Sequence, residues 1–269
     1  MRRSILTLAT VIAAIAVWVA PITARAAGAN TWAPATNSTW QWVLASPPTT
    51  LPAGISWVDV DGFDNTAAQI AAWHAQGLHA VCYIDVGTWE NWRPDASLFP
   101  RQLKGRNNGW PGEKWLNTSP AGPYYATLQR LMTARFKMCA AKGFDAVEPD
   151  NMDGSENTTG FRITNAHQIA YDEWVAAEVH SLGMSVAQKN FNDQSSALVS
   201  HFDFVINEQC YQYHECVNLQ PYVNAHKAVF DVEYRTPCPT KQLVPGVNVM
   251  LRNLNLTQNG RRVVCPTPL

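Results

Sequence analysis

Acidic residues gather at the ends of short apolar segments along this chain of 269 residues. Five such segments end in carboxylates, in the stretches Asp59-Val60-Asp61, Asp85, Glu148-Pro149-Asp150 with Asp153 beyond, Glu208, and Asp231-Val232-Glu233. A sixth segment ends in Lys189-Asn190. A single carboxylate in such a place commonly caps a helix or pairs with a base, but several in one cleft raise some of their pKa values. One carboxyl can then stay protonated beside an ionised one, which is the pair that cleavage of a glycosidic bond needs.

These side chains can meet only if the segments are parallel strands that end at the same edge. Apolar or β-branched segments alternate with helical patterns, as in parallel βαβ units. The candidate strands cover residues 40–44, 56–60, 79–85, 144–148, 185–190, 203–208, 228–233 and 247–252. Helices are predicted over residues 66–76, 124–141 and 165–182, each followed closely by glycine, and weaker ones over 193–200 and 218–225.

Eight strands with such connections predict an α/β fold, a single (β/α)8 barrel of the TIM type, with its chemistry at the carboxyl ends of the strands. An open doubly wound sheet is the alternative, but no Gly-rich phosphate loop follows the first strand. The segment over residues 90–117 is rich in Trp, Pro and Gly and is predicted to be a long loop after the third strand.

Aromatic side chains supply either packing in a core or flat faces that stack on sugars and on cations. The chain has 11 Trp, 8 Tyr and 9 Phe. The candidates for stacking at the barrel mouth are Trp89, Trp92, Trp110, Trp115, Tyr83 and Tyr234. Trp115 and Tyr83 are the preferred two.

The first residues have the pattern of a secretory signal peptide. Arg2 and Arg3 precede an apolar run over residues 5–20, and Ala24-Arg25-Ala26 follows as a small-residue cleavage site. We therefore expect a signal peptide over residues 1–26, a single domain over 27–269, and a secreted protein. A membrane anchor is the alternative, but the run is short and ends at Pro21.

Cleavage would remove Arg2, Arg3 and Arg25 from the 20 basic residues and none of the 21 acidic ones, which leaves a formal net charge of −4. No basic patch for nucleic acid survives. The remaining apolar runs are too short to span a bilayer. We expect a monomer that binds neither nucleic acid nor, once the signal is removed, a membrane.

Six cysteines in an exported chain indicate disulfides. No C-x-x-C pair, H-E-x-x-H motif or Cys/His cluster occurs, so we expect neither a metal nor another cofactor. Fifteen pairings are possible. The close spacing in one polar segment, the shared Pro-rich C-terminal region, and the neighbouring strand and helix favour Cys210 with Cys216, Cys238 with Cys265, and Cys82 with Cys139.

A series of sequence blocks over residues 40–235 is shared with one enzyme family. The blocks are Trp40-Gln41-Trp42, Asp59-Val60-Asp61, residues 82–87, Trp92-Arg93-Pro94-Asp95, residues 110–116, residues 143–153, Lys189-Asn190, Asn207-Glu208-Gln209-Cys210, Glu215-Cys216 and Val232-Glu233-Tyr234. With them the chain resembles glycoside-hydrolase family 114, the endo-α-1,4-polygalactosaminidases. Two positions depart from the pattern: Asp85 stands where many members have a small residue, and Asn117 where many have Asp.

The resemblance implies a retaining endo-hydrolase of α-1,4-linked galactosamine polymers, with one catalytic carboxylate after the fourth strand and one after the sixth. The matching residues are Asp150 and Glu208. We assign Asp150 as nucleophile and Glu208 as general acid/base, with the reverse order of roles still open. The predicted substrate-binding residues are Asp59, Asp61, Tyr83, Asp85, Trp115, Glu148, Asn151, Asp153, Lys189, Asn190, Glu233 and Tyr234.

A galactosamine polymer with free amines is cationic, and an acidic barrel mouth would attract it. Three other interpretations stay open. The first is a barrel glycosidase that acts on another amino sugar or on a neutral glycan, and the second is a polysaccharide-binding protein without activity. The third, a secreted esterase or deacetylase, fits least well, because the chain has no G-x-S-x-G motif and no His/Asp metal set.

Overall fold

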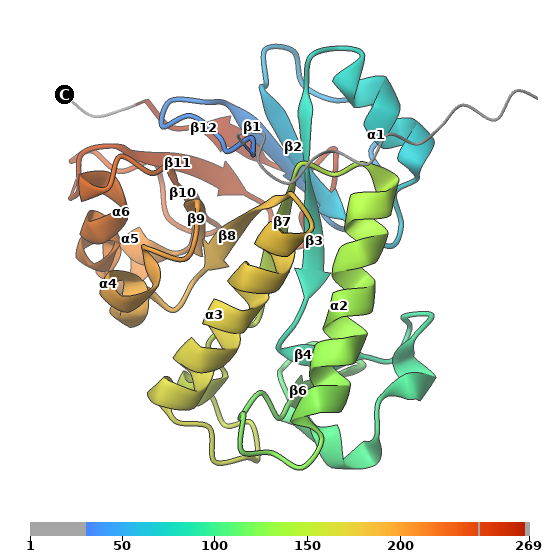
Figure 1. Cartoon of the computed structure of the whole chain (residues 1–269). Helices are drawn as coiled ribbons and strands as arrows, with labels where there is room; N and C mark the ends of the chain where they lie inside the picture. The colour runs from blue at the N-terminus through green and yellow to red at the C-terminus, as the bar shows by residue number, and fades with distance from the viewer. Residues whose placement is uncertain (1–30, 242, 267–269) are drawn as a thin grey trace, which may run out of the picture.

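The computed structural model describes residues 31–241 and 243–266, so the predicted signal peptide lies outside the described residues. Its centre is a nine-stranded sheet in the order β1-β2-β3-β7-β8-β9-β10-β11-β12 (Figure 1). The strands are β1 (Trp40–Val43), β2 (Trp57–Asp61), β3 (His79–Asp85), β7 (Ala146–Asp150), β8 (Ser185–Lys189), β9 (Phe204–Glu208), β10 (Val229–Glu233), β11 (Val247–Arg252) and β12 (Arg262–Val264). The first eight pair in parallel, which confirms the predicted α/β fold of the TIM type. The ninth, β12, is antiparallel to β11 and is an addition to the prediction.

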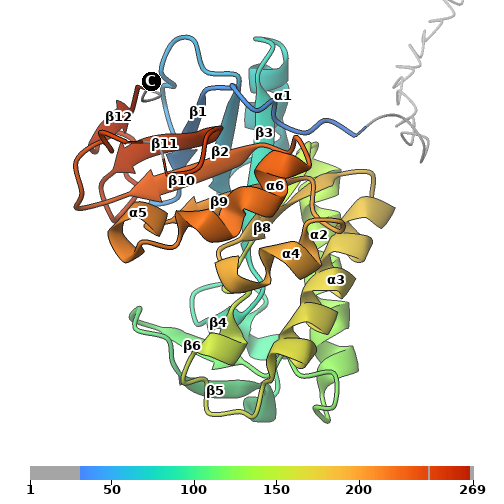
Figure 2. The same cartoon turned by 90° about the vertical axis from the view of Figure 1, so that its left-hand side faces the viewer.

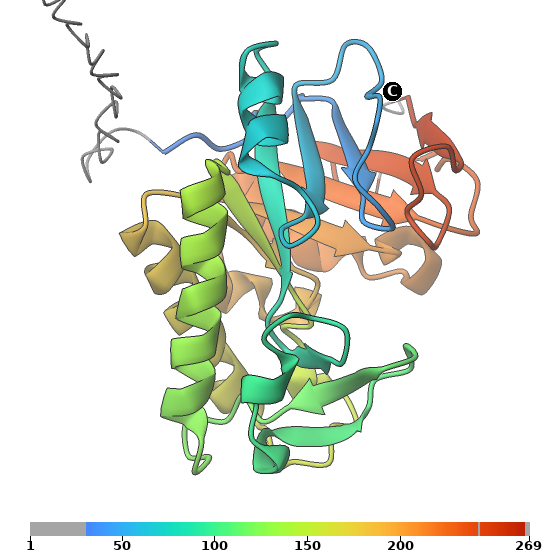
Figure 3. The same ribbon diagram turned by 90° about the vertical axis from the view of Figure 1, so that its right-hand side faces the viewer.

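The sheet curls until its two ends approach each other, with β12 close to β1 (Figures 1 and 3). Across this seam Arg262 Nη2 donates to Trp40 O at 2.7 Å, and Arg252 Nη1 donates to Gln41 Oε1 at 2.8 Å. Beyond the end of β1, Leu44 N donates to the backbone oxygen of Leu256 at 3.1 Å. Within residues 31–241 and 243–266 no ladder joins β1 to β11 or β12. The barrel is therefore closed by side chains and loop contacts along the seam.

Three long helices cover the outer face of the first half of the sheet (Figure 1). They are α1 (Ala67–His74), α2 (Tyr125–Lys142) and α3 (Asn165–Ser181). A capping box between Thr66 and Gln69 begins α1, and Gly143, with φ +91°, ends α2 in the left-handed conformation that glycine adopts without steric cost. All three confirm the predicted helices.

The later connections are shorter than predicted. They contain α4 (Ser195–Leu198), α5 (Cys210–Tyr213) and α6 (Gln220–Asn224). The described residues also form 3-10 turns: η1 (Ala96–Leu98), η2 (Arg101–Leu103), η3 (Gly154–Glu156), η4 (Asn192–Gln194) and η5 (Cys216–Leu219). Of these elements, α4, α5 and α6 cover the second half of the sheet (Figure 2). The barrel is consequently irregular, with its long helices on one side.

The insertion after β3 forms a small sheet, whereas a long loop is predicted from its sequence. Its strands β4 (Thr88–Glu90), β5 (Lys104–Asn107) and β6 (Glu113–Leu116) are antiparallel, in the order β4-β6-β5. Gly109 and Gly112, with φ of +113° and +90°, allow the chain to turn between β5 and β6. The small sheet lies beyond the carboxyl end of β3 (Figure 3), so it borders the mouth of the barrel.

Residues two apart along a strand point to the same face, and along β2, β7, β8 and β9 the inward positions change from apolar to charged. The inward positions at the amino ends are apolar and include a stack of Trp40 on Trp57 with ring centroids 4.6 Å apart. Several of the 11 Trp thus fill the core. Two and four residues further along, the same faces carry the polar side chains of the site: Trp57 is followed by Asp59 and Asp61, Ala146 by Glu148 and Asp150, Ala187 by Lys189, and Ile206 by Glu208.

The three predicted disulfides are present: Cys82 with Cys139, Cys210 with Cys216, and Cys238 with Cys265. The first ties β3 to α2, and the second closes α5 directly after β9. None of the helices in the described residues combines the length and hydropathy of a membrane span.

Candidate active site

Lys189 at the end of β8 lies between the two predicted catalytic carboxylates. Its Nζ is 3.0 Å from Asp150 Oδ1 and 3.3 Å from Glu208 Oε2, and it also contacts Glu148 Oε1 at 3.0 Å. The Lys189 side chain is 98% buried, and its ammonium lies 4.7 Å from the ring centroid of Trp42. Burial alone would lower the pKa of Lys189, but the three carboxylates together raise it well above its usual range. Lys189 therefore remains a fixed positive charge between Asp150 and Glu208.

Asp150 is held in its ionised form. Its Oδ2 accepts a hydrogen bond from the Tyr83 hydroxyl at 2.7 Å, and its Oδ1 accepts one from Asn151 N at 2.8 Å. Burial would raise the pKa of this carboxyl, but the charge of Lys189 and these hydrogen bonds hold it below the usual value. An ionised carboxylate at the cleft is what a nucleophile requires.

Glu208 has its own set of donors. The Tyr234 hydroxyl donates to Oε1, and Asn190 Nδ2 donates to Oε2 at 3.2 Å. Asn190 also accepts from Glu208 N at 2.9 Å through its Oδ1, so one amide fixes both the backbone and the side chain of Glu208. Each catalytic candidate thus has one tyrosine donor and shares Lys189 with the other.

The chain turns sharply after each of the strands that supply these residues. Asn151 after β7, Asn190 after β8 and Gln209 after β9 all have left-handed backbones, with φ of 60°, 49° and 66°. Asn adopts this region more readily than most residues, and single left-handed residues of this kind cluster at functional sites. The turns end the strands immediately after Asp150, Lys189 and Glu208, so these side chains stay at the mouth.

Beneath this pair lies a buried polar layer. Glu148 Oε2 accepts a hydrogen bond from Trp42 Nε1 at 3.0 Å, and its other oxygen contacts Lys189. Burial, partly offset by Lys189, raises the pKa of Glu148 to about 7. Asp59 is fully buried next to Glu148, and burial followed by repulsion from Glu148 raises its pKa well above the usual range.

The cleft above this layer has a volume of about 590 Å³ and is bordered by the strand ends, the small sheet and the loop after β11. Of the predicted site residues, those that line it are Asp61, Tyr83, Trp115, Asp150, Asn151, Asp153, Lys189, Asn190, Glu208 and Tyr234. Burial and the neighbouring Asp150 raise the pKa of Asp153 to about 6. Trp92 and Trp110, about half exposed, also border the cleft, whereas Trp89 is not among its lining residues and donates through Nε1 to Ala96 O at 2.9 Å.

Four predicted substrate-binding residues, Asp59, Asp85, Glu148 and Glu233, are buried and do not line the cleft. Glu233 caps the start of α5, because its Oε1 accepts from Tyr211 N at 2.8 Å and from Gln212 N at 3.2 Å. Asp61 borders the cleft but forms a two-point ion pair with buried Arg93, with N–O distances of 3.0 and 2.6 Å. The side chains of these residues position the site from below or from its edge.

Other lining residues do not follow from the strand-end pattern. They include Trp42, Asp64, Glu90, Arg93, Asn108, Glu113, Asn157, and Leu254 to Leu256. Trp42, Arg93 and Glu113 fall in the shared sequence blocks, which is the signal that could have singled them out. The loop over residues 254–256 carries no such signal.

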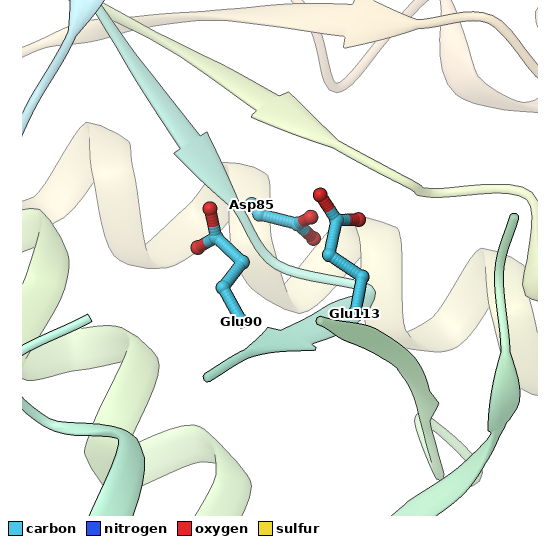
Figure 4. A group of neighbouring side chains, drawn as sticks. All are labelled: Asp85, Glu90 and Glu113. Atoms are coloured by element: carbon cyan, nitrogen blue, oxygen red, sulfur yellow. The ribbon is translucent and has the colours of Figure 1, made fainter. Parts of the chain in front are cut away.

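Asp85, Glu90 and Glu113 form an acidic cluster beside the cleft. Figure 4 shows the three side chains converging from β3, β4 and β6, and their nearest oxygens lie within 4.8 Å of one another. Glu90 pairs with Arg93 at 2.6 Å, and Asp85 accepts from Thr88 N at 2.7 Å and from Asn151 at 2.9 Å. Donors from the protein thus already surround these carboxylates, and we assign no metal to them.

One known protein family matches almost the whole chain. The family model of glycoside-hydrolase family GH114 matches residues 21–267. The chain belongs to family GH114. It is therefore a glycoside hydrolase, and the resemblance read from the sequence blocks is confirmed.

Solved structures agree with membership of family GH114. The chain is 30% identical to Ega3 of Aspergillus fumigatus, solved in complex with galactosamine, over 86% of this chain and 97% of that one, with a TM-score of 0.77. The glycoside hydrolase domain of PelA from Pseudomonas aeruginosa shares the fold, with 14% identity, coverage of 84% and 99%, and a TM-score of 0.63. No curated protein matches the chain.

Proposed function

We propose that this chain is a secreted, retaining endo-glycosidase that cleaves polymers of α-1,4-linked galactosamine, with Asp150 as nucleophile and Glu208 as general acid/base. The observation that carries the proposal is the contact of one buried ammonium, Lys189, with both carboxylates at the barrel mouth. Membership of family GH114 and the likeness to a galactosamine-bound structure support the substrate class.

The position of Lys189 suits a reaction in two displacements. In the first, Asp150 attacks the anomeric carbon while Glu208 gives its proton to the departing oxygen, so that negative charge leaves Asp150 and appears on Glu208. Lys189, at 3.0 and 3.3 Å from the two side chains, stabilises the charge in both places. In the second displacement Glu208 takes a proton from water, which attacks the glycosyl-enzyme, and the charge returns to Asp150.

The spacing of the two carboxylates supports retention of anomeric configuration. Asp150 Oδ1 and Glu208 Oε2 can be no further apart than 6.3 Å, the sum of their distances to Lys189 Nζ. Retaining enzymes hold their carboxyl groups about 5 to 5.5 Å apart, whereas inverting enzymes leave about 6.5 to 9.5 Å for a water molecule. This limit applies to one oxygen of each carboxyl, and it is compatible with the retaining spacing.

The charge of the cleft supports a cationic substrate. Seven carboxylates line it against two basic side chains, Arg93 and Lys189, both of which are already paired. Burial, followed by repulsion from Asp61 in one case and from Asp150 in the other, raises the pKa values of Asp64 and Asp153. A sugar with a free amine would relieve this excess of negative charge, whereas a neutral glycan would not.

The shape of the cleft supports cleavage within a polymer. A second hollow of about 250 Å³ shares Asp153, Asn190 and Glu208 with the main cleft. It is also acidic, with Glu156, Asp193 and Glu215 in its lining. Binding surface thus extends to both sides of Glu208, as an endo-acting enzyme needs.

Secretion is part of the proposal. Its support is the pattern of residues 1–26 in the sequence, together with three disulfides that use all six cysteines. Disulfides of this number are typical of proteins that fold in an oxidising compartment.

The decisive experiment compares substrates. The mature chain is incubated with galactosaminogalactan and, separately, with chitosan, and the products are identified by mass spectrometry. We expect oligo-galactosamine from the first polymer only, and NMR of the first product should show the α anomer of a retaining reaction. The Asp150→Asn variant is the control for contaminating activity.

Each other outcome points to a different function. Products from chitosan alone would overturn the substrate assignment, and a β anomer as the first product would overturn retention. Binding of galactosaminogalactan without any cleavage by the wild-type chain would favour a polysaccharide-binding protein.

A further inference from the structure

The carboxyl of Asp59 is buried where no N–H or O–H group of the described residues donates a hydrogen bond to it. In the sheet it lies opposite Trp42 of β1 and Val81 of β3, in the middle of β2. Its side chain is fully buried, and neither oxygen accepts a hydrogen bond from an N–H or O–H group of the described residues. An ionised carboxylate in this position would be strongly destabilising, because burial removes its hydration and nothing replaces it.

The neighbouring polar group is a second buried carboxyl, that of Glu148: Trp42, which lies opposite Asp59 in the sheet, donates to Glu148 Oε2, and repulsion from Glu148 helps to raise the pKa of Asp59. Two carboxyl groups buried side by side avoid repulsion when one of them carries a proton that it can donate to the other. Glu148 accepts from Trp42 Nε1 at 3.0 Å and contacts Lys189 Nζ at 3.0 Å. Both neighbours favour the ionised form of Glu148, so the shared proton belongs to Asp59.

The charges around Lys189 lead to the same assignment. This ammonium is already in contact with Glu148, Asp150 and Glu208. An ionised Asp59 would add a fourth carboxylate to a layer that holds one positive charge, and it would repel Glu148 from its place beside Lys189.

We propose that Asp59 is a positioning residue that carries a proton at neutral pH and donates it to Glu148, which in turn holds Lys189 between Asp150 and Glu208. Asp59 touches no substrate in this proposal. It acts by fixing the carboxylate that fixes the ammonium.

Infrared spectroscopy tests the protonation state without reference to any substrate. The carbonyl stretch of a protonated carboxylic acid is recorded at pH 8, above the pKa of about 7 of Glu148, for the wild type and for the Asp59→Asn and Glu148→Gln variants. We expect Asp59→Asn to lose one such band and Glu148→Gln to keep it. A loss in Glu148→Gln and not in Asp59→Asn would put the proton on Glu148, and a loss in neither would mean that both groups are ionised; either result overturns the proposal.

Kinetics test the positioning role, and this part of the experiment rests on the proposed function. The amide N–H of Asp59→Asn can still donate to Glu148. This variant should therefore keep kcat within about threefold of the wild type, a smaller change than the loss of one hydrogen bond to a charged group would cause. Asp59→Leu cannot donate, and kcat should fall about tenfold to a hundredfold with little change in KM. Equal losses of kcat in both variants would show that Asp59 acts as an ionised carboxylate. Full activity of Asp59→Leu would show that Glu148 needs no positioning by Asp59. Either result overturns the positioning role.

Two controls separate the causes of failure. Asp172→Asn replaces another fully buried acid, on α3, and should leave kcat unchanged. If Asp59→Leu does not fold, the infrared bands and the Asp59→Asn rates still decide the proposal. If the wild type cleaves no polymer, the proposed function fails while the infrared result stands on its own.

Discussion

At the scale of single residues, the two proposed catalytic groups differ in protonation: Asp150 attacks as a carboxylate, whereas Glu208 must carry a proton to donate it to the leaving group. Asp150→Asn should abolish polymer cleavage, with a loss of roughly four or more orders of magnitude, because an amide cannot form the glycosyl-enzyme. Glu208→Gln should also lose most activity on the polymer, but a substrate with an activated leaving group should recover part of it, since such a group departs without protonation.

Steady-state rates on both kinds of substrate check this asymmetry. Recovery in Asp150→Asn and not in Glu208→Gln would reverse the two roles. Near-normal rates in both variants would place the active site elsewhere.

Lys189 offers a second test at this scale. Lys189→Met should lower kcat about a hundredfold to a thousandfold, comparable to the removal of one electrostatic donor from a transition state. Without the ammonium, burial is opposed only by hydrogen bonds, and the pKa of Asp150 should rise. The acidic limb of the profile of kcat/KM against pH should therefore move to higher pH.

Lys227→Met is the matched control, because the Lys227 ammonium donates to the backbone oxygens of Val199 and Phe202 and contacts no carboxylate of the site. Its pH profile should coincide with that of the wild type. An unchanged acidic limb in Lys189→Met would mean that Lys189 does not set the protonation of Asp150.

Many residues of the site could be predicted from the sequence, but the depth at which each side chain lies in the barrel could not. Strand ends and shared sequence blocks were enough to select Asp150, Glu208 and Lys189, all of which meet in the cleft. Asp59 and Glu148 have the same inward direction but lie one step deeper, because two residues along a strand amount to roughly 7 Å. A sequence gives the face of a strand directly, but the depth at which the cavity begins depends on how the strands are staggered.

At the scale of elements, the loop closed by Cys210 and Cys216 begins two residues after Glu208. The backbone N–H of Cys210 donates to Asp231 Oδ1 at 3.1 Å, which joins this loop to β10. Cys210→Ala with Cys216→Ala should lower the free energy of unfolding by about 2 kcal/mol, since the closed loop is short. Activity should fall about tenfold or more, because Glu208 loses its support.

The pair Cys238→Ala with Cys265→Ala serves as the comparison. Its separation of 27 residues predicts a larger loss of stability, between about 3 and 4 kcal/mol, with near-normal activity wherever the protein stays folded. Urea unfolding and rate measurements together check this reversed order. Equal losses of activity in both double variants would contradict it.

Elements were predictable where the pattern was periodic. The bounds of β3 and β11 agree with the prediction residue for residue, because both are apolar and buried along most of their length. The small sheet was missed since its strands are short and polar, as in Lys104-Gly105-Arg106-Asn107 of β5. β12 has only three residues, two of them exposed, and its pairing with β11 depends on the fold around it.

At the scale of the whole molecule, buried acids make stability depend on pH. Burial is the first cause that raises the pKa of Glu148 to about 7 and that of Asp153 to about 6. Between their ordinary values of 4.5 and 3.8 and these raised values, the folded state binds more protons than the unfolded one. The free energy of unfolding should therefore fall as pH rises through this window.

Calorimetry checks the direction. The Tm should be several degrees higher at pH 5 than at pH 8, and Glu148→Gln should weaken this dependence because its amide does not titrate. A Tm that rises from pH 5 to pH 8 in the wild type would contradict the assignment.

The seam between β1 and the last strands also has a consequence for the timing of folding. The other neighbouring strands of the barrel follow one another along the chain, whereas the contacts from Arg252 to Gln41 and from Arg262 to Trp40 span 211 and 222 residues. Contacts between distant residues form slowly, and during synthesis these cannot form before β11 and β12 have been made. Trp42, which donates to Glu148 beneath the site, belongs to β1, the strand whose contacts across the seam form late. The chain should therefore gain its catalytic competence only late in folding, when the two edges of the sheet meet.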